Sequence, residues 1–350
     1  MTIFLTVACS NNRNSILPQE TTLTNPKINL EHFNHLFTAI NVADRKMGVV
    51  NIYSKYPDYA YAIEPAEGFA CVDDVARAII MLAQHLELEH DDEVLQKLKM
   101  LTEFILYMQN DNGYFNNFIW QDLSINTSYK TSKAGMNWWS FRALWSLQVA
   151  YENFHTDLDL TNRIDKAINK LIENIKRDIP LISLYTEVVN TVTIPAWLPN
   201  KYAADQAAVA IIALLPYYQR SNDKQVLAII NVLAKGIIQM QKGDADNYPY
   251  GMFLSWKNQW HSWGNSQAYA LLLAGQQLGR EEYIQSALLE IDNFYPYLLK
   301  NGLAESIWIE QKADGFSETY KKHFPQIAYG IRPMVYAVSE AFRITKKHKY

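Results

Sequence analysis

The sequence predicts an all-α fold, an α/α toroid in which a ring of inner helices is surrounded by outer helices. Helices rich in Ala, Leu and Ile are expected to begin near residues 73, 137, 203, 264 and 326, at intervals of 64, 66, 61 and 62 residues. A near-constant period with two helices per unit is typical of a repeat architecture. The first helix of each pair is apolar on almost all sides and must be buried, whereas the second is amphipathic.

The individual helices follow from their start signals and from the spacing of apolar residues. The acids Asp73 and Asp74 suit the positive end of one helix dipole, and Asp91 and Asp92 suit the start of the next. The expected helices span residues 30–45, 73–86, 92–109, 137–153, 158–178, 202–219, 222–241, 264–278, 281–299 and 326–344.

These helices are expected to form one domain over residues 30–346, preceded by a polar tether over 1–29. The helix at 30–45 would be the outer partner of the last inner helix and would close the ring. This gives five complete helical hairpins, and residues 46–70 have room for a sixth. Long aromatic loops separate the pairs, and alternating β-formers in 114–132 predict a small β-hairpin at one end of the toroid.

Composition excludes several classes of function. The net charge is −4 and no stripe of Lys and Arg is interleaved with aromatic residues, so we expect no nucleic-acid partner. The sequence has no apolar run of about 18 residues, so we expect no membrane span. Two cysteines and the absence of Cys/His spacing argue against a disulfide framework and against a metal site. No phosphate-binding or dinucleotide-binding motif is present, and we expect no cofactor.

The N-terminus carries one targeting signal. Residues 5–9, Leu-Thr-Val-Ala-Cys, followed by a polar stretch, resemble the end of a bacterial lipoprotein signal peptide, although the basic segment is missing and the apolar stretch is short. In such proteins the cysteine is lipidated, so Cys9 would be the only membrane anchor. With this anchor the protein would work in the bacterial envelope, as a periplasmic or outer-membrane lipoprotein, and without it in the cytoplasm.

Aligning the inner helices predicts a shared site. The aligned residues are a buried alanine in each helix, at positions 78, 143, 210, 270 and 337. The residues five positions earlier are Asp73, Trp138, Asp205, Asn265 and Arg332. Because all inner helices of a toroid run the same way, these side chains would meet at one end of the ring. Helix capping alone is an alternative explanation for the Asp and Asn residues, but not for the Trp and Arg.

Aromatic rings beside carboxylates and amides suit a carbohydrate, whose rings stack on Trp and whose hydroxyls need polar partners. Cleavage of a glycosidic bond requires two carboxyl groups. The catalytic candidates are Asp73, Asp74, Asp205 and Glu187. The expected substrate-binding residues are Trp138, Trp139, Trp263, Tyr250, Asn265, Arg332 and Glu305. Capping or an ion pair with Arg77 is the alternative role for Asp74, and a solvated loop position is the alternative for Glu187 and Glu305.

Three segments carry a resemblance to a known family. Residues 68–78, Gly-Phe-Ala-Cys-Val-Asp-Asp-Val-Ala-Arg-Ala, resemble the Gly-Tyr-x-x-Asp-Asp-Asn-Ala-Arg-Ala motif of an α/α-toroid domain found alone or appended to bacterial glycosyltransferases. Residues 113–118 and 142–147 are similar to its next two motifs, Gly-x-Phe-x-Asn-Phe and Gly-Arg-Ala-Leu-Trp-Ala-Leu. The wider resemblance is to six-hairpin glycosidases. Val75 replaces the family Asn, and 136–141 replaces a Ser/Asp/Gly-rich stretch, so the wall of the site differs.

The resemblance implies a role with carbohydrate more firmly than it implies a defined reaction. We therefore predict a protein that acts on an oligo- or polysaccharide, as a glycoside hydrolase using paired carboxylates. A polysaccharide lyase or sugar epimerase on the same fold is the first alternative, with His261 or Tyr329 as the base. A non-catalytic glycan-binding lipoprotein is the second.

Overall fold

The computed structural model describes residues 28–323 and 328–350 and confirms the predicted mostly helical architecture. The five inner helices are α2 (Val72–Leu88), α4 (Trp138–Asn153), α6 (Ala204–Ser221), α8 (Gln267–Leu278) and α10 (Ala328–Thr345). The outer helices are α3 (Asp92–Tyr107), α5 (Leu158–Asp178), α7 (Lys224–Met240) and α9 (Glu281–Lys300). Each follows its inner partner in the chain and packs against it.

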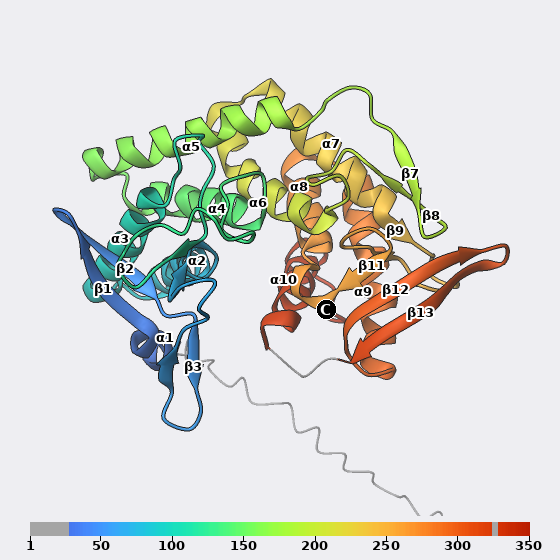
Figure 1. Ribbon diagram of the computed structural model, residues 1–350. Coiled ribbons are helices and arrows are strands. Elements are labelled where there is room, and N and C mark those ends of the chain that lie inside the picture. Colours follow the sequence, from blue (N-terminus) through green and yellow to red (C-terminus); the bar gives the residue numbers. More distant parts are fainter. Residues whose placement is uncertain (1–27, 324–327) are drawn as a thin grey trace, which may run out of the picture.

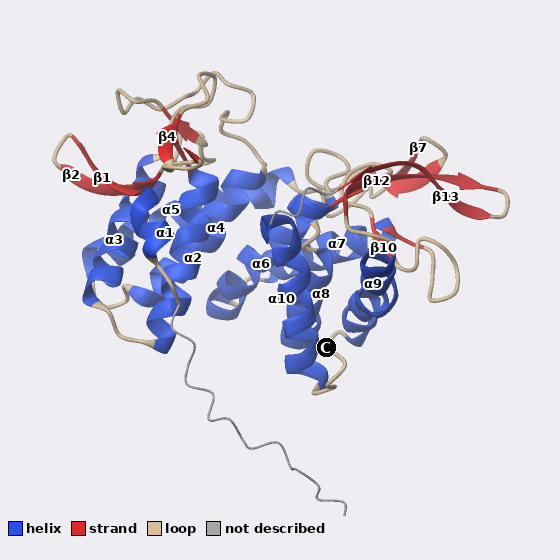
Figure 2. Cartoon of the chain, turned by 90° about the horizontal axis from the view of Figure 1, so that it is seen from below, coloured by secondary structure: helices blue, strands red, loops and turns tan. Residues whose placement is uncertain are grey.

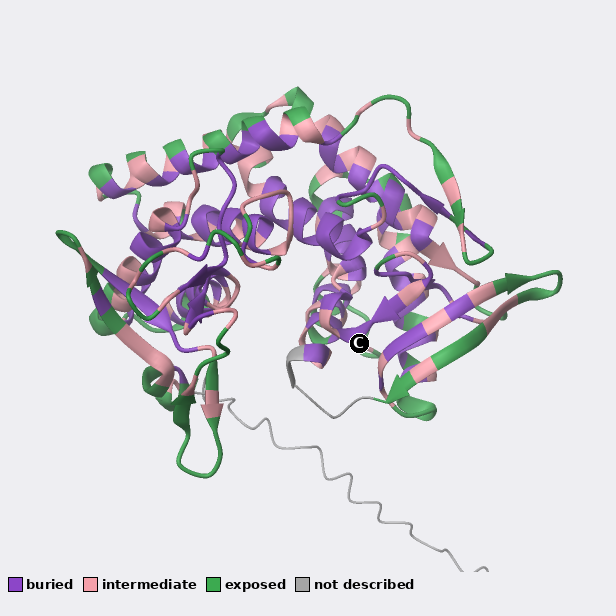
Figure 3. Ribbon diagram, in the orientation of Figure 1, coloured by how far each residue is buried: buried purple, intermediate pink, exposed green. Residues whose placement is uncertain are grey.

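The inner helices contact one another in chain order, from α2 through α4, α6 and α8 to α10. Figure 1 shows them as an arc inside the outer helices, with α2 and α10 at its two ends. Burial follows this arrangement, since every residue from Ala204 to Leu215 of α6 is buried. The outer helices expose one face, which Figure 3 shows for α5. An inner helix apolar on all sides and an amphipathic outer helix are what the sequence patterns predicted.

Side-chain caps fix where several helices begin. Asp91, Asn137, Asp157 and Asp223 each accept a hydrogen bond from a backbone N–H group in the first turn of the helix that follows. Such caps satisfy donors that have no partner inside the helix. The helix start predicted near residue 137 therefore has a clear local cause.

Short antiparallel strands connect the helices and gather at one end of the array, as Figure 2 shows. The strands are β1 (Phe37–Val42), β2 (Arg45–Val50), β3 (Tyr53–Lys55), β4 (Ala60–Ala62), β5 (Ala70–Cys71), β6 (Phe118–Ile119), β7 (Thr186–Val189), β8 (Val192–Pro195), β9 (Gln241–Lys242), β10 (Met252–Phe253), β11 (Gln259–His261), β12 (Ala304–Lys312) and β13 (Gly315–His323). A short 3-10 helix, η1 (Ser262–Gly264), precedes α8. The predicted position of small β-structure at one end is confirmed.

The predicted helix at 30–45 is wrong beyond its first turns. Helix α1 spans only Glu31–Leu36, and the chain then forms the β1–β2 hairpin, which packs on α3. Thr38, Ile40 and Val42 alternate along β1, which is a strand period rather than a helix period. Because no long helix pairs with α10 on its outer side in the described chain, the expected closure of the ring by this segment is not observed.

Two further expectations need correction. Residues 46–70 hold no sixth helical hairpin but strands β2 to β5. Residues 114–132 contribute only the short strand β6, which pairs with β5, and an isolated bridge between Ile119 and Ile125. The β5–β6 pair nevertheless has a role, because it leads directly into the N-terminus of α2.

The N-terminal expectations fall on residues that the structure does not describe. Cys9 and most of the predicted tether lie outside the described ranges. Across residues 28–323 and 328–350, no helix has the length and apolar character needed to span a membrane.

Candidate functional site

A cavity of about 460 Å³ lies among the inner helices. It is lined by the N-terminal halves of α2, α4, α6, α8 and α10, together with residues near α1. All five aligned alanines are preceded by a residue that lines it: Arg77, Arg142, Val209, Tyr269 and Tyr336. The face of each inner helix that points to the cavity therefore lies one residue before the alanine. Among the five predicted positions, only Arg332 lines the cavity itself.

The walls of the cavity combine apolar and polar side chains. Met81, Trp145 and Ile212 form part of the apolar lining. The rings of Tyr269 and Tyr336 also line the cavity and lie 5.6 Å apart. Burial raises the pKa of Tyr269 to about 12, so its hydroxyl keeps its proton at neutral pH and can donate a hydrogen bond.

Two carboxylates lie in the first turn of α2, ahead of the cavity-lining residues of that helix. Asp73 accepts a hydrogen bond from Arg142 Nη1 at 2.7 Å, and its side chain is 19% exposed. Asp74 forms an ion pair with Arg77, accepts a weak hydrogen bond from Cys71 Sγ at 3.2 Å, and is 32% exposed. Both carboxylates are thus ion-paired and still accessible. The pairing expected as one alternative for Asp74 is present.

Arg142 joins two of the predicted site residues. Besides its ion pair with Asp73, its guanidinium lies over the ring of Trp138, 4.6 Å from the ring centre. Its positive charge also acts on Asp205, where it favours the ionised form. Arg142 therefore contacts Asp73 and Trp138 directly, and its charge also acts on Asp205.

Asp205 is buried and is paired with a histidine. Its Oδ2 lies 3.0 Å from His261 Nε2, and both side chains are 5% exposed. Burial raises the pKa of Asp205, and the hydrogen bond with His261 partly opposes the rise. Nδ1 of His261 has no hydrogen-bond partner in the described chain.

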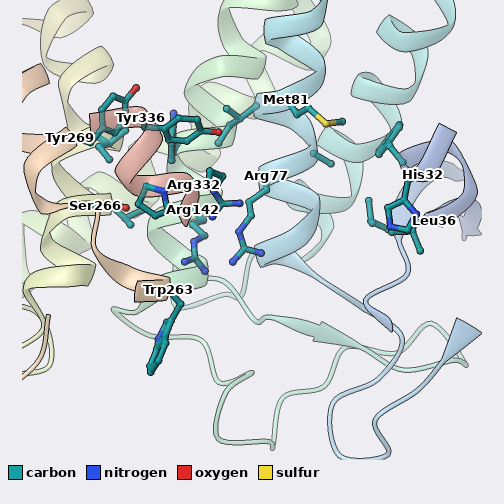
Figure 4. Close-up of a pocket in the computed structure, with 18 of the residues that line it drawn as sticks. His32, Leu36, Arg77, Met81, Arg142, Trp263, Ser266, Tyr269, Arg332 and Tyr336 are labelled. Carbon is teal, nitrogen blue, oxygen red and sulfur yellow. The ribbon is translucent and has the colours of Figure 1, made fainter. Parts of the chain in front are cut away.

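Trp263 covers this pair. The His261 and Trp263 rings are stacked with centroids 4.0 Å apart and an interplanar angle of 10°. Trp263 also lines the cavity, and Figure 4 shows it at the edge of the pocket below Arg142. Gly264 packs tightly against these groups, because a Cβ there would overlap His261 and lie 2.8 Å from Trp138.

Asn265 follows η1 and is 1% exposed. Neither its side-chain oxygen nor its side-chain nitrogen has a hydrogen-bond partner in the described chain. A buried amide without partners is costly, and such groups often mark a place where water or a ligand binds. Asn265 lies four residues after His261 and is not among the residues that line the cavity.

Four other predicted residues lie away from the cavity lining. The Glu187 side chain, on β7, accepts a hydrogen bond from Tyr202, which lowers the pKa of this carboxyl, and pairs with Lys201 at 3.6 Å. Glu305, on β12, pairs with Lys322 at 2.8 Å. Both acids are in partly exposed ion pairs, in line with the solvated-loop alternative.

The other two are aromatic. Trp139 is buried, and its Nε1–H donates to the Phe115 carbonyl at 2.8 Å, so it supports the core. Tyr250 packs in a cluster with Tyr248 and Tyr297, at ring distances of 5.8 and 5.1 Å.

The alignment did not select Arg77, Arg142, Tyr269 and Tyr336 as site residues. A signal was present for the two arginines, since both belong to the motifs that carry the family resemblance. Figure 4 shows both of them with Arg332 in the pocket. The side chain of Tyr329, an alternative base, lies outside the described residues. In the ranges 28–323 and 328–350, no group of three or more His, Cys, Asp or Glu residues could hold a metal ion.

Comparison with solved structures identifies the fold. No family model matches the sequence, and no curated protein matches it. The chain is similar to a sugar epimerase from a ruminal bacterium, with a TM-score of 0.58 and 11% identity over 86% of this chain and 76% of that one. It is also similar to the cellobiose 2-epimerase from Spirochaeta thermophila, with a TM-score of 0.51 and 14% identity over 79% and 71%.

A third similar structure is a family 76 glycoside hydrolase from a bovine Bacteroides thetaiotaomicron strain. Its TM-score is 0.52 with 12% identity, over 85% of this chain and 62% of that one. These proteins share with this chain an architecture of inner helices packed inside outer helices, the α/α toroid. The chain therefore has that fold, as its motifs predicted. At such low identity the likeness concerns the fold alone.

Proposed function

We propose that the protein binds an oligosaccharide at the central cavity and hydrolyses a glycosidic bond at its mouth. The observation that carries the proposal is the arrangement around Arg142. The accessible carboxylate of Asp73 and the Trp138 ring both contact this guanidinium beside the cavity, and its charge also acts on the buried Asp205. Similar folds in a glycoside hydrolase and in sugar epimerases support a carbohydrate substrate.

The two carboxyl groups have different environments, which suits them to different roles. Asp73 is paired with a guanidinium, and a carboxylate in this state can accept a proton from water. Asp205 has its pKa raised by burial, so it is the group that holds a proton to a higher pH. We therefore assign Asp205 as the proton donor to the leaving oxygen, with its carboxyl group held in position by the hydrogen bond to His261.

Asparagine substitutions test this assignment. Asp73→Asn and Asp205→Asn each remove one carboxyl group with little change in shape, and a lost general acid or base typically costs roughly 10²- to 10⁴-fold in rate. Asp314→Asn, at an exposed turn between β12 and β13, is the matched control. The assay measures new reducing ends from a panel of purified oligosaccharides. Wild-type rates in both site variants would show that Asp73 and Asp205 are not the catalytic carboxyl groups.

A second function has its own support. A histidine oriented by a buried carboxylate is suited to remove a proton from carbon, as a sugar epimerase or polysaccharide lyase requires. In that case His261→Gln abolishes turnover while Asp73→Asn retains it. Incorporation of deuterium from solvent at a sugar carbon, or absorbance of an unsaturated uronide, would select this function over hydrolysis.

The lipid anchor at Cys9 is a separate proposal that rests on the sequence alone. We infer that the full-length protein is a bacterial envelope lipoprotein. Expression in a bacterial host with a labelled fatty acid tests this, with Cys9→Ala as the control. Equal labelling of the two proteins, or no labelling of either, would contradict it.

A further inference from the structure

Three arginine side chains line the cavity from similar positions near the starts of their helices. Arg77 is the sixth residue of α2, Arg142 the fifth residue of α4, and Arg332 the fifth residue of α10. All three line the cavity, and Figure 4 shows them close together although they come from three different helices. Because arginine stays protonated in proteins, these positions bring three permanent cations to one part of the cavity wall.

No carboxylate lines this cavity in the part of the chain that the structure describes. The acids Asp73 and Asp74, which pair with Arg142 and Arg77, lie about one helical turn earlier. Arg332 also has an interaction within the chain. An ion pair does not exhaust a guanidinium, since each carries five N–H donors in a planar fork. The arginines can therefore keep their present partners and still bind an anionic group.

We propose that the saccharide bound here carries a carboxylate, as in a uronic acid residue, and that Arg77, Arg142 and Arg332 recognise it. This inference rests on the proposed function, which supplies the saccharide. A planar carboxylate matches the guanidinium fork and accepts two parallel hydrogen bonds from it. Lysine would offer only a point charge, whereas three arginines select for the geometry of the anion as well as its sign.

The depth of the arginines also sets where the acidic sugar lies relative to the reacting bond. Arg77 follows Asp73 by four residues, which is about 6 Å along a helix. The uronic acid residue then occupies the cavity, against Tyr269 and Tyr336, while the bond to the next sugar lies at the mouth near Asp73. The hydroxyl of Tyr269, protonated at neutral pH, is available to a sugar oxygen.

Monosaccharides test the inference because the cavity is expected to hold one sugar unit. The probes are glucuronate, galacturonate and mannuronate, each compared with its neutral parent sugar, and glucose 6-sulfate and glucose 6-phosphate. Binding to the full chain is measured by calorimetry and by ligand-observed NMR at low and high salt. At least one uronate is expected to bind roughly tenfold or more tightly than its parent, since hydrogen bonds to charged groups contribute about 1.5–3 kcal/mol. The preference should weaken in high salt.

Three variants complete the test. Arg332→Gln is expected to remove the preference for the uronate, and Arg332→Lys to restore part of it. Arg45→Gln, at an exposed position in the β1–β2 hairpin, should leave it unchanged. Circular dichroism of each variant shows that loss of binding is not loss of folding. If Arg332→Gln does not fold, the wild type still tests whether the cavity recognises a carboxylate. The comparison is between the uronate and its parent sugar, at low and high salt.

The outcomes separate the inference from the proposed function. Equal or tighter binding of the neutral sugars, together with loss of turnover in Asp73→Asn, overturns the acidic substrate and keeps the hydrolase. Binding of the sulfated or phosphorylated sugar without any uronate overturns the carboxylate assignment. If no sugar of either charge binds and no oligosaccharide is cleaved, the proposed function fails and the inference fails with it.

Discussion

Glu290 offers a quantitative test of how the site is supported. This residue of the outer helix α9 is fully buried, and its Oε1 accepts a hydrogen bond from the Phe253 N–H at 2.8 Å. Phe253 leads into the segment that holds Ser255, whose hydroxyl accepts the His261 N–H at 3.1 Å. The carboxyl of Glu290 thus fixes the start of the loop that brings His261 to Asp205.

Burial raises the pKa of Glu290 from 4.5 to about 8, partly opposed by the Phe253 N–H. A group whose pKa is higher in the folded state stabilises the fold fully below its unfolded pKa, and this stability is lost as the pH rises through the folded value. A difference of about 3.5 pKa units corresponds to about 5 kcal/mol, lost between about pH 4.5 and pH 8.

Glu290→Gln removes the ionisation and keeps an oxygen that can accept the Phe253 N–H. We expect the wild type to lose up to about 5 kcal/mol of unfolding free energy between pH 5 and pH 9 from this group. The variant should lose much less and be the more stable protein at pH 9. Urea unfolding followed by circular dichroism at pH 5, 7 and 9 measures the difference. Glu282→Gln, at an exposed position of the same helix, is the control.

Two results would refute this reasoning. If the wild type and Glu290→Gln lose the same stability between pH 5 and pH 9, the buried carboxyl does not have a raised pKa. If Glu282→Gln flattens the pH dependence as much as Glu290→Gln does, the effect comes from net charge rather than from burial.

Two further substitutions test the packing around the site. Gly264→Ala would push a Cβ into the ring of His261 and to 2.8 Å from Trp138, so turnover should fall roughly 10²-fold, measured by steady-state kinetics, with the fold retained by circular dichroism. Unchanged kinetics would show that turnover does not depend on the position of the His261 ring. Trp139→Phe removes the N–H that bonds the buried Phe115 carbonyl and should lower the free energy of unfolding by about 1–3 kcal/mol in urea, without changing sugar preference. A changed sugar preference in Trp139→Phe would show that Trp139 contributes to sugar binding.

The order and pairing of the main helices could be predicted because their signals are local. A cap such as Asn137 and a run of apolar residues act over a few positions of the chain. The error at 30–45 has a similar cause. Short apolar stretches suit either a helix or a strand, and the pairing of β1 with β2, not the composition, decides the outcome.

The site could be predicted only in part. An inner helix that is apolar on all sides does not show in its sequence which face points to the axis of the ring. The alignment therefore selected the layer of Asp73 and Asp205 at the helix entrances, while the cavity face begins at residues such as Arg77 and Arg142. The contact between Asp205 and His261 joins residues 56 positions apart through a docked loop, and no local pattern indicates it.

We propose that a saccharide reacts beside Arg142, at the mouth of the cavity. The most direct measurement is turnover of one saccharide that the wild type converts, compared between wild type, Asp73→Asn and Asp205→Asn, with binding measured on the same samples. Both variants are expected to bind the saccharide still and to lose roughly 10²-fold or more in rate. Full activity in both variants would contradict it.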